Sequence, residues 1–269
     1  NVSIHTGAKG KCTSVVTACA SGTNSIGDAF RAIQYGDADV MFAGGSESCI
    51  CPTGVAGFTA LTALTTTEDP LRASIPFDKD RSGFVIGEGA GIVVLEELEH
   101  AKRRGAKIYA EVCGYGSTCD AHHVTAPDET AVASARAIKE AMAELEGVPA
   151  EKIYINAHGT GTALNDKTET NAIRKALGEE DAQKVHISST KSMTGHMLGA
   201  AGAAEAIAAI CAMNNSLVPP TINLQEQDEV CDLHYTPNVA EEAELEAVLS
   251  TSLGFGGHNA CIAFRKFKG

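Results

Sequence analysis

The sequence predicts a layered α/β fold, and two observations lead to this prediction. First, β-branched, apolar stretches alternate along the chain with segments whose apolar residues recur at helical spacing. Strands that alternate with helices are typical of α/β layers. Second, residues 13–33 and 186–210 both run from a short apolar stretch through a Ser/Thr-rich turn into a segment crowded with Gly and Ala. We interpret this similarity as a weak internal repeat.

The expected elements follow in chain order. Strands are predicted at Thr13–Thr17, Asp39–Ala43, Ala90–Leu95, Tyr109–Tyr115, Ile153–Asn156, His186–Ser189, Val248–Ser252 and Ala260–Phe267. Helices are predicted at Ser21–Tyr35, Ala131–Leu145, Lys167–Leu177 and Gly199–Met213. The first and last of these helices are rich in small residues, which suits burial on all sides and close approach of two backbones. We therefore expect them side by side at the centre of the molecule.

Composition indicates a globular protein and limits its function. The 269 residues are 44% hydrophobic and 20% charged, as in an ordinary folded domain. A formal net charge of -13 argues against a nucleic-acid binder, which needs clustered Lys and Arg to neutralise phosphates. One basic run, Lys102 to Lys107, could face an acidic partner, although a solvated helix end is the simpler interpretation. No apolar run approaches the roughly 20 residues that span a bilayer, so we expect no membrane segment.

The nine cysteines predict neither disulfides nor a metal site. Their number is odd, no signal peptide precedes them, and no pair of C-x-x-C motifs is present. We therefore expect a reducing, cytosol-like compartment.

The first candidate site is V-V-T-A-C-A-S-G, which places Cys19 between a predicted strand and the first small-residue helix. Backbone N–H groups and the helix dipole favour negative charge at a helix N-terminus, so we expect a lowered thiol pKa and a nucleophilic thiolate. A buried, inert cysteine is the alternative, and this motif alone leaves both open.

The second candidate is I-Y-I-N-A-H-G-T-G-T, in which an apolar strand leads into a loop that contains His158. Gly159 and Gly161 leave room for a ligand near the backbone, while Thr160 and Thr162 offer hydroxyl groups. A purely structural histidine is the alternative.

The third candidate is S-S-T-K-S-M-T-G-H-M-L-G-A-A-G-A-A-E, which places Lys191 and His196 before the second small-residue helix and Glu205 inside it. A carboxylate among Gly and Ala is expected to be buried and to need a partner, for which Lys191 is the candidate. We expect this pair to orient the site.

The fourth candidate is S-L-G-F-G-G-H-N-A, a Gly-rich turn between two predicted strands. It could be an ordinary hairpin. In a catalytic site it could present backbone N–H groups to an oxyanion, with Phe255 as an apolar gate.

Together these stretches resemble the elongating beta-ketoacyl-acyl carrier protein synthases, which have the thiolase fold. The matching motifs are T-A-C-A-S-G, P-F-D-K-D-R-S-G-F-V-I-G-E-G-A-G, N-A-H-G-T-G-T-x-x-N-D-x-x-E-T, K-S-M-T-G-H-x-L-G-A-A-G and G-F-G-G-H-N. The resemblance implies α-β-α-β-α layers built from two pseudo-repeated halves. We assign residues 1–108 to the C-terminal part of the first, nucleophile half and residues 109–269 to the second, histidine half. The N-terminal portion of the family is then missing.

By this resemblance the expected activity is a decarboxylative Claisen condensation in fatty-acid elongation. Cys19 would accept an acyl group from an acyl carrier protein, and malonyl-acyl carrier protein would then react to give 3-oxoacyl-acyl carrier protein. His158 and His196 would stabilise the enolate that forms as carbon dioxide leaves. No cofactor and no metal are expected.

The other roles that the resemblance implies concern binding and orientation. Backbone N–H groups of Cys19 and Phe255 would form the oxyanion hole, and Lys191 with Glu205 would fix the electrostatics around His158. The residues expected to contact substrate are Thr160 and Thr162 for the pantetheine arm, and Phe84 and Phe255 for the acyl channel. Leu253 and His258 stand where the family usually has Phe and Thr, a departure that concerns acyl-chain preference and gate motion.

The resemblance also implies a homodimer that works with acyl carrier protein in the cytoplasm or in the plastid stroma, without nucleic acid or membrane. Three alternatives remain. A polyketide-type ketosynthase would usually have Glu at Asn156 and Asn at Met193, and a non-catalytic chain-length partner subunit would lack Cys19. The chain could also be an inactive portion that folds only with its missing piece.

Overall fold

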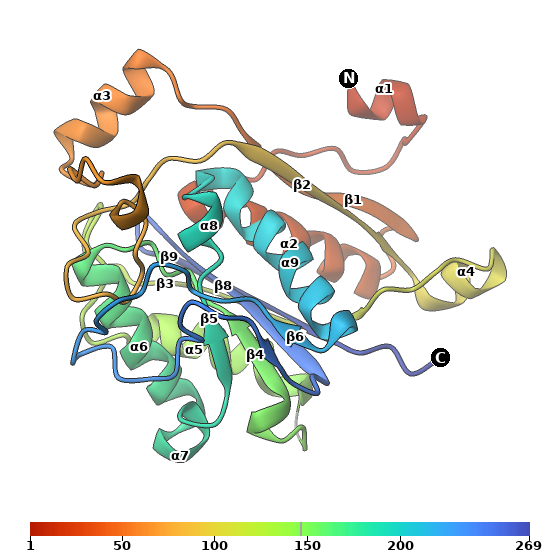
Figure 1. Cartoon of the computed structure of the whole chain (residues 1–269). Helices are drawn as coiled ribbons and strands as arrows, with labels where there is room; N and C mark the ends of the chain where they lie inside the picture. Colours follow the sequence, from red (N-terminus) through yellow and green to blue (C-terminus); the bar gives the residue numbers. More distant parts are fainter. Residues whose placement is uncertain (146) are drawn as a thin grey trace.

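Two central helices lie between two β-sheets in the computed structural model, which describes residues 1–145 and 147–269 (Figure 1). The helices are α2 (Ser21–Gln34) and α9 (Ala201–Asn215). On one side of them lies an antiparallel pair, β1 (Val40–Glu47) and β2 (Gly89–Glu96), and on the other side lies a five-stranded sheet. The order of these layers confirms the predicted α/β architecture.

The five-stranded sheet has the order β3-β9-β8-β4-β5. Its members are β3 (Glu111–Cys119), β4 (Ile153–Asn156), β5 (His186–Ser188), β8 (Ala247–Gly254) and β9 (His258–Arg265). Strand β4 runs parallel to β5 and β8, whereas β9 is antiparallel to both β8 and β3. Every residue of β4 is buried, because helices cover both faces of the sheet.

The face of this sheet opposite the central helices is covered by α5 (Val132–Met142) and α6 (Ala163–Leu177). A large apolar core fills this interface, and a second apolar core lies between the sheet and the central helices. Together with the β1–β2 pair, the molecule therefore has four consecutive layers in the order β-α-β-α.

The central helices approach closely because small residues lie at their contact. A Cβ atom added at Gly22 would lie 2.8 Å from the backbone nitrogen of Ala203, and one added at Gly202 would lie 2.0 Å from Oγ1 of Thr23. Larger side chains would therefore force the helices apart. This confirms the prediction that the two Gly/Ala-rich helices lie side by side.

The internal repeat is visible in the structure around each central helix. The short 3-10 helix η1 (Ala18–Ala20) precedes α2, and η5 (Leu198–Ala200) precedes α9. Each begins with a non-glycine residue at positive φ, with 50° at Ala18 and 45° at Leu198, a conformation that such residues seldom adopt. An antiparallel strand pair lies later in the chain than each central helix, with other short elements in between: β1–β2 after α2, and β8–β9 after α9.

The remaining elements are short and mostly peripheral. They are α1 (Val2–Thr6), α3 (Pro52–Ala60), η2 (Pro70–Arg72), α4 (Leu98–Arg103), η3 (Ala143–Leu145), η4 (Ala150–Lys152), α7 (Glu179–Ala182), α8 (Lys191–Thr194), β6 (Leu217–Val218) and β7 (Glu241–Glu242). Helix α3 has no buried residue, and Phe42, Ile92 and Val94 are exposed on the outer face of β1–β2. Among the residues with a described position, no helix combines the length and apolar character needed to cross a membrane.

One predicted element is wrong. Thr13–Thr17 forms no strand, and Val16 within it is 81% exposed. The segment pairs with no strand in the described part of the chain. Its last residue turns into η1 instead, because the N–H of Thr17 donates to Oγ of Ser21 at 2.9 Å and its carbonyl accepts from the N–H of Ala20 at 3.0 Å. The other seven predicted strands and all four predicted helices are present, with ends shifted by a few residues.

Candidate active site

The structure brings Cys19, His158 and His196 together from three separate segments of the chain. One ligand-type atom of each residue, the sulfur or a ring nitrogen, lies within 4.8 Å of the others, and all three residues are buried. Cys19 lies in η1, His158 follows β4, and His196 follows α8. All three line a cavity of about 350 Å³.

The environment of Cys19 contradicts one expectation from the sequence. Burial raises the pKa of its thiol from 9.0 to about 11, although the positive charge of Lys191 and the backbone N–H of Phe255 act in the opposite direction. The expected lowering of the pKa by the helix start is therefore outweighed by loss of water around the sulfur. Cys19 is a free thiol, as are the other eight cysteines.

A buried carboxylate of α6 holds the loop that carries His158. The backbone N–H groups of His158 and Gly159 donate hydrogen bonds of 2.7 Å and 2.8 Å to the two carboxylate oxygens of Glu169. The hydroxyl of Thr251 on β8 donates to the same carboxylate at 2.6 Å. These bonds fix where the imidazole of His158 enters the cavity.

His196 is positioned mainly by backbone contacts. Its N–H donates to the carbonyl of Val85 at 2.7 Å, and its carbonyl accepts from the N–H of Gly87 at 2.9 Å. Its ring meets the rings of Phe84 and His158 edge to face, with centroids 5.1 Å apart in both cases. The segment before β2, which belongs to the first half of the chain, therefore positions a histidine of the second half.

Lys191 and Glu205 form the buried ion pair that the sequence predicts. Nζ of Lys191 also lies 3.3 Å from Nδ1 of His158. An ammonium group can only donate, so Nδ1 accepts and the proton of a neutral His158 ring is on Nε2. Burial lowers the pKa of His158 well below 6.5, and Lys191 and then His196 lower it further. Burial and Lys191 lower the pKa of His196 in the same way, so both rings are neutral at pH 7.

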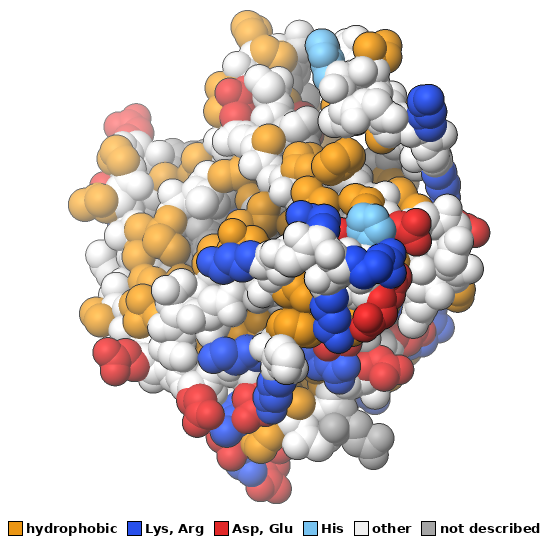
Figure 2. Space-filling model, turned by 90° about the vertical axis from the view of Figure 1, so that its right-hand side faces the viewer, with side chains coloured by type: hydrophobic (Ala, Val, Ile, Leu, Met, Phe, Trp, Pro, Cys, Tyr) orange, Lys and Arg blue, Asp and Glu red, His pale blue; other side chains and the backbone are white. Residues whose placement is uncertain are grey.

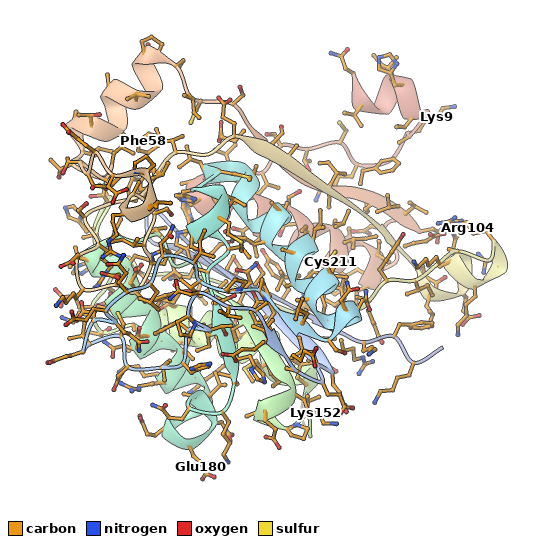
Figure 3. The ribbon with its side chains drawn as sticks, viewed as in Figure 1. Lys9, Phe58, Arg104, Lys152, Glu180 and Cys211 are labelled. Carbon is orange, nitrogen blue, oxygen red and sulfur yellow. The ribbon has the colours of Figure 1, made fainter. Side chains whose placement is uncertain are left out.

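The cavity walls contain the other four residues that the sequence singles out for substrate contact. They are Phe84, Thr160, Thr162 and Phe255. Phe58 on α3, labelled in Figure 3, also lines the cavity. Its ring contacts that of Phe84, with centroids 5.4 Å apart. Leu253 lines the cavity too, whereas His258 lies over the hairpin turn, where a Cβ atom added at Gly256 would come within 3.1 Å of its Nε2.

Sequence reasoning assigned no role to the buried acids of α6. Besides Glu169, Asp166 accepts hydrogen bonds from the N–H groups of Phe77, at 2.8 Å, and Gly161, at 3.2 Å. Its carboxylate lies 3.5 Å from Nε of Arg81. Asp166 and Glu169 are three residues apart, so they share one helix face directly after the histidine loop. That spacing is the signal that could have identified them.

The basic run at the end of α4 lies far from this cavity. Phe58 and Arg104, both labelled in Figure 3, are on opposite sides of the molecule. Figure 2 shows basic side chains interspersed with acidic ones on the side of the molecule where α4 lies. Arg104 pairs with Glu96 at 2.6 Å and Lys102 pairs with Glu99 at 3.2 Å. This supports the interpretation of the run as a solvated helix end.

Family models and relatives agree with this geometry. The model of the beta-ketoacyl synthase N-terminal domain matches residues 1–101, and the model of the C-terminal domain matches residues 109–225. A protein of Synechocystis sp. named 3-oxoacyl-[acyl-carrier-protein] synthase 2 is 52% identical over 266 residues, which are 98% of this chain and 64% of that protein. A protein of the same name from Staphylococcus aureus is 50% identical, with 99% of this chain and 64% of that protein covered. The chain thus spans just under two thirds of the length of these relatives.

Solved structures show the same fold. The ketosynthase of a type II polyketide synthase, in complex with its acyl carrier protein and bound to a hexaketide, superposes with a TM-score of 0.94 at 43% identity, covering 99% of this chain and 65% of that one. A beta-ketoacyl synthase from Burkholderia phymatum superposes with a TM-score of 0.92 at 41% identity, covering 99% of this chain and 64% of that one. On the two domain models, these relatives and the shared thiolase-like fold, the chain belongs to the beta-ketoacyl synthase family.

Proposed function

We propose that this chain carries the condensing centre of a 3-oxoacyl-acyl carrier protein synthase of fatty-acid elongation. The observation that carries the proposal is the convergence of a buried thiol and two neutral imidazoles on one cavity. The names of relatives that are about half identical state this activity for those proteins.

In the first step, Sγ of Cys19 attacks the thioester carbonyl of an acyl carrier protein. The new Cys19 thioester forms as the carrier thiol leaves, and the proton that Cys19 loses balances the one that the departing thiol gains. The thiol is protonated at rest because its pKa is about 11, so its proton must leave as the attack proceeds. Backbone N–H groups of Cys19 and Phe255 serve as the oxyanion hole.

In the second step, malonyl-acyl carrier protein loses carbon dioxide, and the electrons of the broken C–C bond form an enolate. His158 can donate Nε2–H to the enolate oxygen, because Lys191 occupies the Nδ1 side of its ring. We assign the second donor role to His196. The enolate carbon then attacks the acyl group, and the Cys19 thiolate leaves as 3-oxoacyl-acyl carrier protein forms.

Binding roles complete the proposal. Thr160 and Thr162, whose hydroxyl oxygens are 3.0 Å apart on the cavity wall, bind the polar pantetheine arm. Phe84 and Phe255 shape the acyl channel. Leu253 lines the same cavity, so the size of the side chain at this position affects the width of the channel. Glu205 holds the ammonium of Lys191 beside His158. The reaction is driven by the thioester and by loss of carbon dioxide, so we assign it no cofactor.

The remaining proposals rest on the family alone. They are acyl carrier protein as the partner in its acyl and malonyl forms, a homodimer, and a cytoplasmic or plastid-stromal location. The division into a nucleophile half up to residue 108 and a histidine half from residue 109 is supported by the internal repeat and by the boundary between the two domain matches.

A two-step assay tests the function. The protein is incubated with an acyl carrier protein that carries a saturated acyl chain, and the adduct is located by peptide mass spectrometry. We expect the acyl mass on the peptide with Cys19, and its discharge to a 3-oxoacyl product when malonyl carrier is added. If Cys19 stays unmodified in folded protein, the activity is wrong and a non-catalytic chain-length partner becomes the better assignment.

Polyketide synthesis is the second candidate, because a polyketide ketosynthase is among the structures that superpose well. Asn156 and Met193 favour fatty-acid elongation by the family pattern. Several successive malonyl extensions without reduction, observed on one acyl chain, would assign the chain to polyketide synthesis instead.

A further inference from the structure

We propose that Lys191 keeps the cluster of Cys19, His158 and His196 free of thiophilic metal ions, and that an amide in its place converts the cluster into a zinc site. The proposal concerns metal binding and does not depend on the condensing activity.

The cluster has the composition of a zinc site. Zinc in proteins is bound by Cys sulfur and His nitrogen, and its catalytic sites use three protein ligands with a fourth position left open. One atom of each residue already lies within 4.8 Å of the others, beside a cavity that leaves room for a fourth ligand. Zn–S and Zn–N bonds of about 2.3 Å and 2.0 Å place neighbouring tetrahedral ligands about 3.3 to 3.6 Å apart. The separations between these atoms would therefore have to shorten by up to about 1.5 Å.

Lys191 gives His158 the wrong hydrogen-bonding partner for a metal ligand. A ligating histidine coordinates through one bare ring nitrogen and donates the N–H of the other to an acceptor such as a carboxylate or a carbonyl. Nδ1 of His158 instead faces the ammonium of Lys191 at 3.3 Å, and an ammonium has no lone pair. The ring proton is thereby held on Nε2, the nitrogen that a metal in the cluster would need.

The positive charge of Lys191 also opposes metal binding. The side chain of Lys191 is 1% exposed, so water screens the repulsion between its ammonium group and a divalent cation very little. Its partner Glu205 has one carboxylate oxygen, Oε2, with no hydrogen-bond partner among the described residues. Removing the ammonium would remove this repulsion, while Glu205, whose pKa is raised by burial, would lose its partner and take up a proton.

Lys191→Gln removes both obstacles to metal binding, the ring proton held on Nε2 of His158 and the positive charge beside the cluster, with little change in side-chain shape. The amide oxygen can accept Nδ1–H of His158 while the amide nitrogen donates to Glu205, which frees Nε2 to coordinate. When the metal binds, the S–H bond of Cys19 breaks, its proton goes to solvent, and the sulfur lone pair forms the metal bond. No electron transfer is involved.

Cobalt(II) is the probe, because a thiolate bound to it gives a charge-transfer band in the near ultraviolet, and zinc can then be titrated in to displace it. We expect Lys191→Gln to bind cobalt at least tenfold more tightly than the unmodified protein. Lys191→Arg keeps the charge and the donors, so it should bind as weakly as the unmodified protein. Lys167→Gln is the matched control, since this lysine is exposed and pairs with Glu129 at 3.2 Å.

Three results would overturn the proposal. They are an equally strong band in the unmodified protein, a band in Lys191→Arg equal to that of Lys191→Gln, and no band in Lys191→Gln while Cys19 still reacts with a thiol reagent. If that variant does not fold, Lys191→Gln combined with Glu205→Gln keeps an amide acceptor for Nδ1–H of His158 and leaves no unpaired buried carboxyl group, and the same criteria apply. Adding Cys19→Ser must abolish the band. Acylation of Cys19 in the unmodified protein is measured separately, so failure of the proposed function would be recognised independently.

Discussion

The turns that open the two central helices have nearly the same backbone but different chemistry. Both η1 and η5 begin at a non-glycine residue with positive φ, and both lead into a helix rich in small residues. The middle residue is Cys19 in the first turn and Gly199 in the second. One turn therefore presents a side chain to the cavity, while the other offers only backbone.

The difference shows how a repeated framework is specialised by single residues. The second half supplies the other reactive groups from its loops, with His158 held by a carboxylate and His196 held by backbone hydrogen bonds. A chemical role thus depends on which side chain stands at a given place in the repeat, and substitutions at equivalent places should have unequal effects.

The largest difference in condensation activity is expected between the variants Cys19→Ala and Gly199→Ala, which change equivalent positions of the two turns. Loss of the nucleophile should reduce condensation by roughly a thousandfold or more. A Cβ atom at Gly199 would lie 3.2 Å from the flexible carboxylate of Glu47 and at an ordinary contact distance of 3.8 Å from Cβ of Ser21, so Gly199→Ala should cost about 1 kcal/mol or less. Product formation from acyl and malonyl carriers measures the first effect, and urea unfolding measures the second. Comparable activities of the two variants would contradict the specialisation of the turns.

The next largest effect is expected at Glu169, which distinguishes the support of His158 from that of His196. In Glu169→Gln, an amide N–H₂ replaces one acceptor, and one backbone N–H of the loop loses its partner. Displacement of His158 should slow malonyl decarboxylation by up to about a hundredfold.

Acylation of Cys19 should change much less in this variant, and the split between the two half-reactions separates positioning from general damage. The exposed Glu129→Gln is the control and should leave both rates unchanged. Equal losses in both half-reactions would mean that Glu169 only stabilises the fold.

The sequence predicted the parts of this molecule that depend on local pattern. The central helices follow from their small residues, and β4 follows from its continuous apolar run. The Lys191–Glu205 pair follows from the cost of an isolated buried charge. Each of these depends on the composition of one segment, which is visible without knowing its neighbours.

The errors arose where distant neighbours decide the outcome. Thr13–Thr17 has strand composition, but strand formation requires a partner that the pattern does not reveal. The pKa of Cys19 depends on how much water the surrounding loops exclude, and burial outweighed the helix start. The role of Glu169 was missed because two of its three hydrogen-bond donors are backbone N–H groups of a loop, and the spacing of Asp166 and Glu169 on one helix face does not reveal which loop they bind.

A smaller effect is expected where the two central helices touch. Gly202→Ala would place a methyl group 2.0 Å from Oγ1 of Thr23 and 2.9 Å from Oγ of Ser252, which should cost about 1 to 3 kcal/mol of unfolding free energy. Gly57→Ala on the exposed α3 meets no atom within 4 Å and should stabilise by roughly 0.5 to 1 kcal/mol through helix propensity. Chemical unfolding of both variants tests this. A tolerated Gly202→Ala would mean that the helices are not tightly packed.

The smallest effect concerns the pH dependence of stability, to which the two halves should contribute on opposite sides. The neutral rings of His158 and His196 have pKa values lowered well below 6.5, so the unfolded chain binds more protons and stability falls as pH drops below about 6.5. The pKa of Cys19 is raised from 9.0 to about 11, so its stabilising contribution is complete below pH 9 and is lost as pH rises toward 11. Each group changes the slope by at most about 1.4 kcal/mol per pH unit. When the free energy of unfolding is measured across pH, His196→Gln should flatten its pH dependence only on the acid side, and Cys19→Ala only on the alkaline side. If either variant flattens the side assigned to the other, the burial assigned to these groups is incorrect.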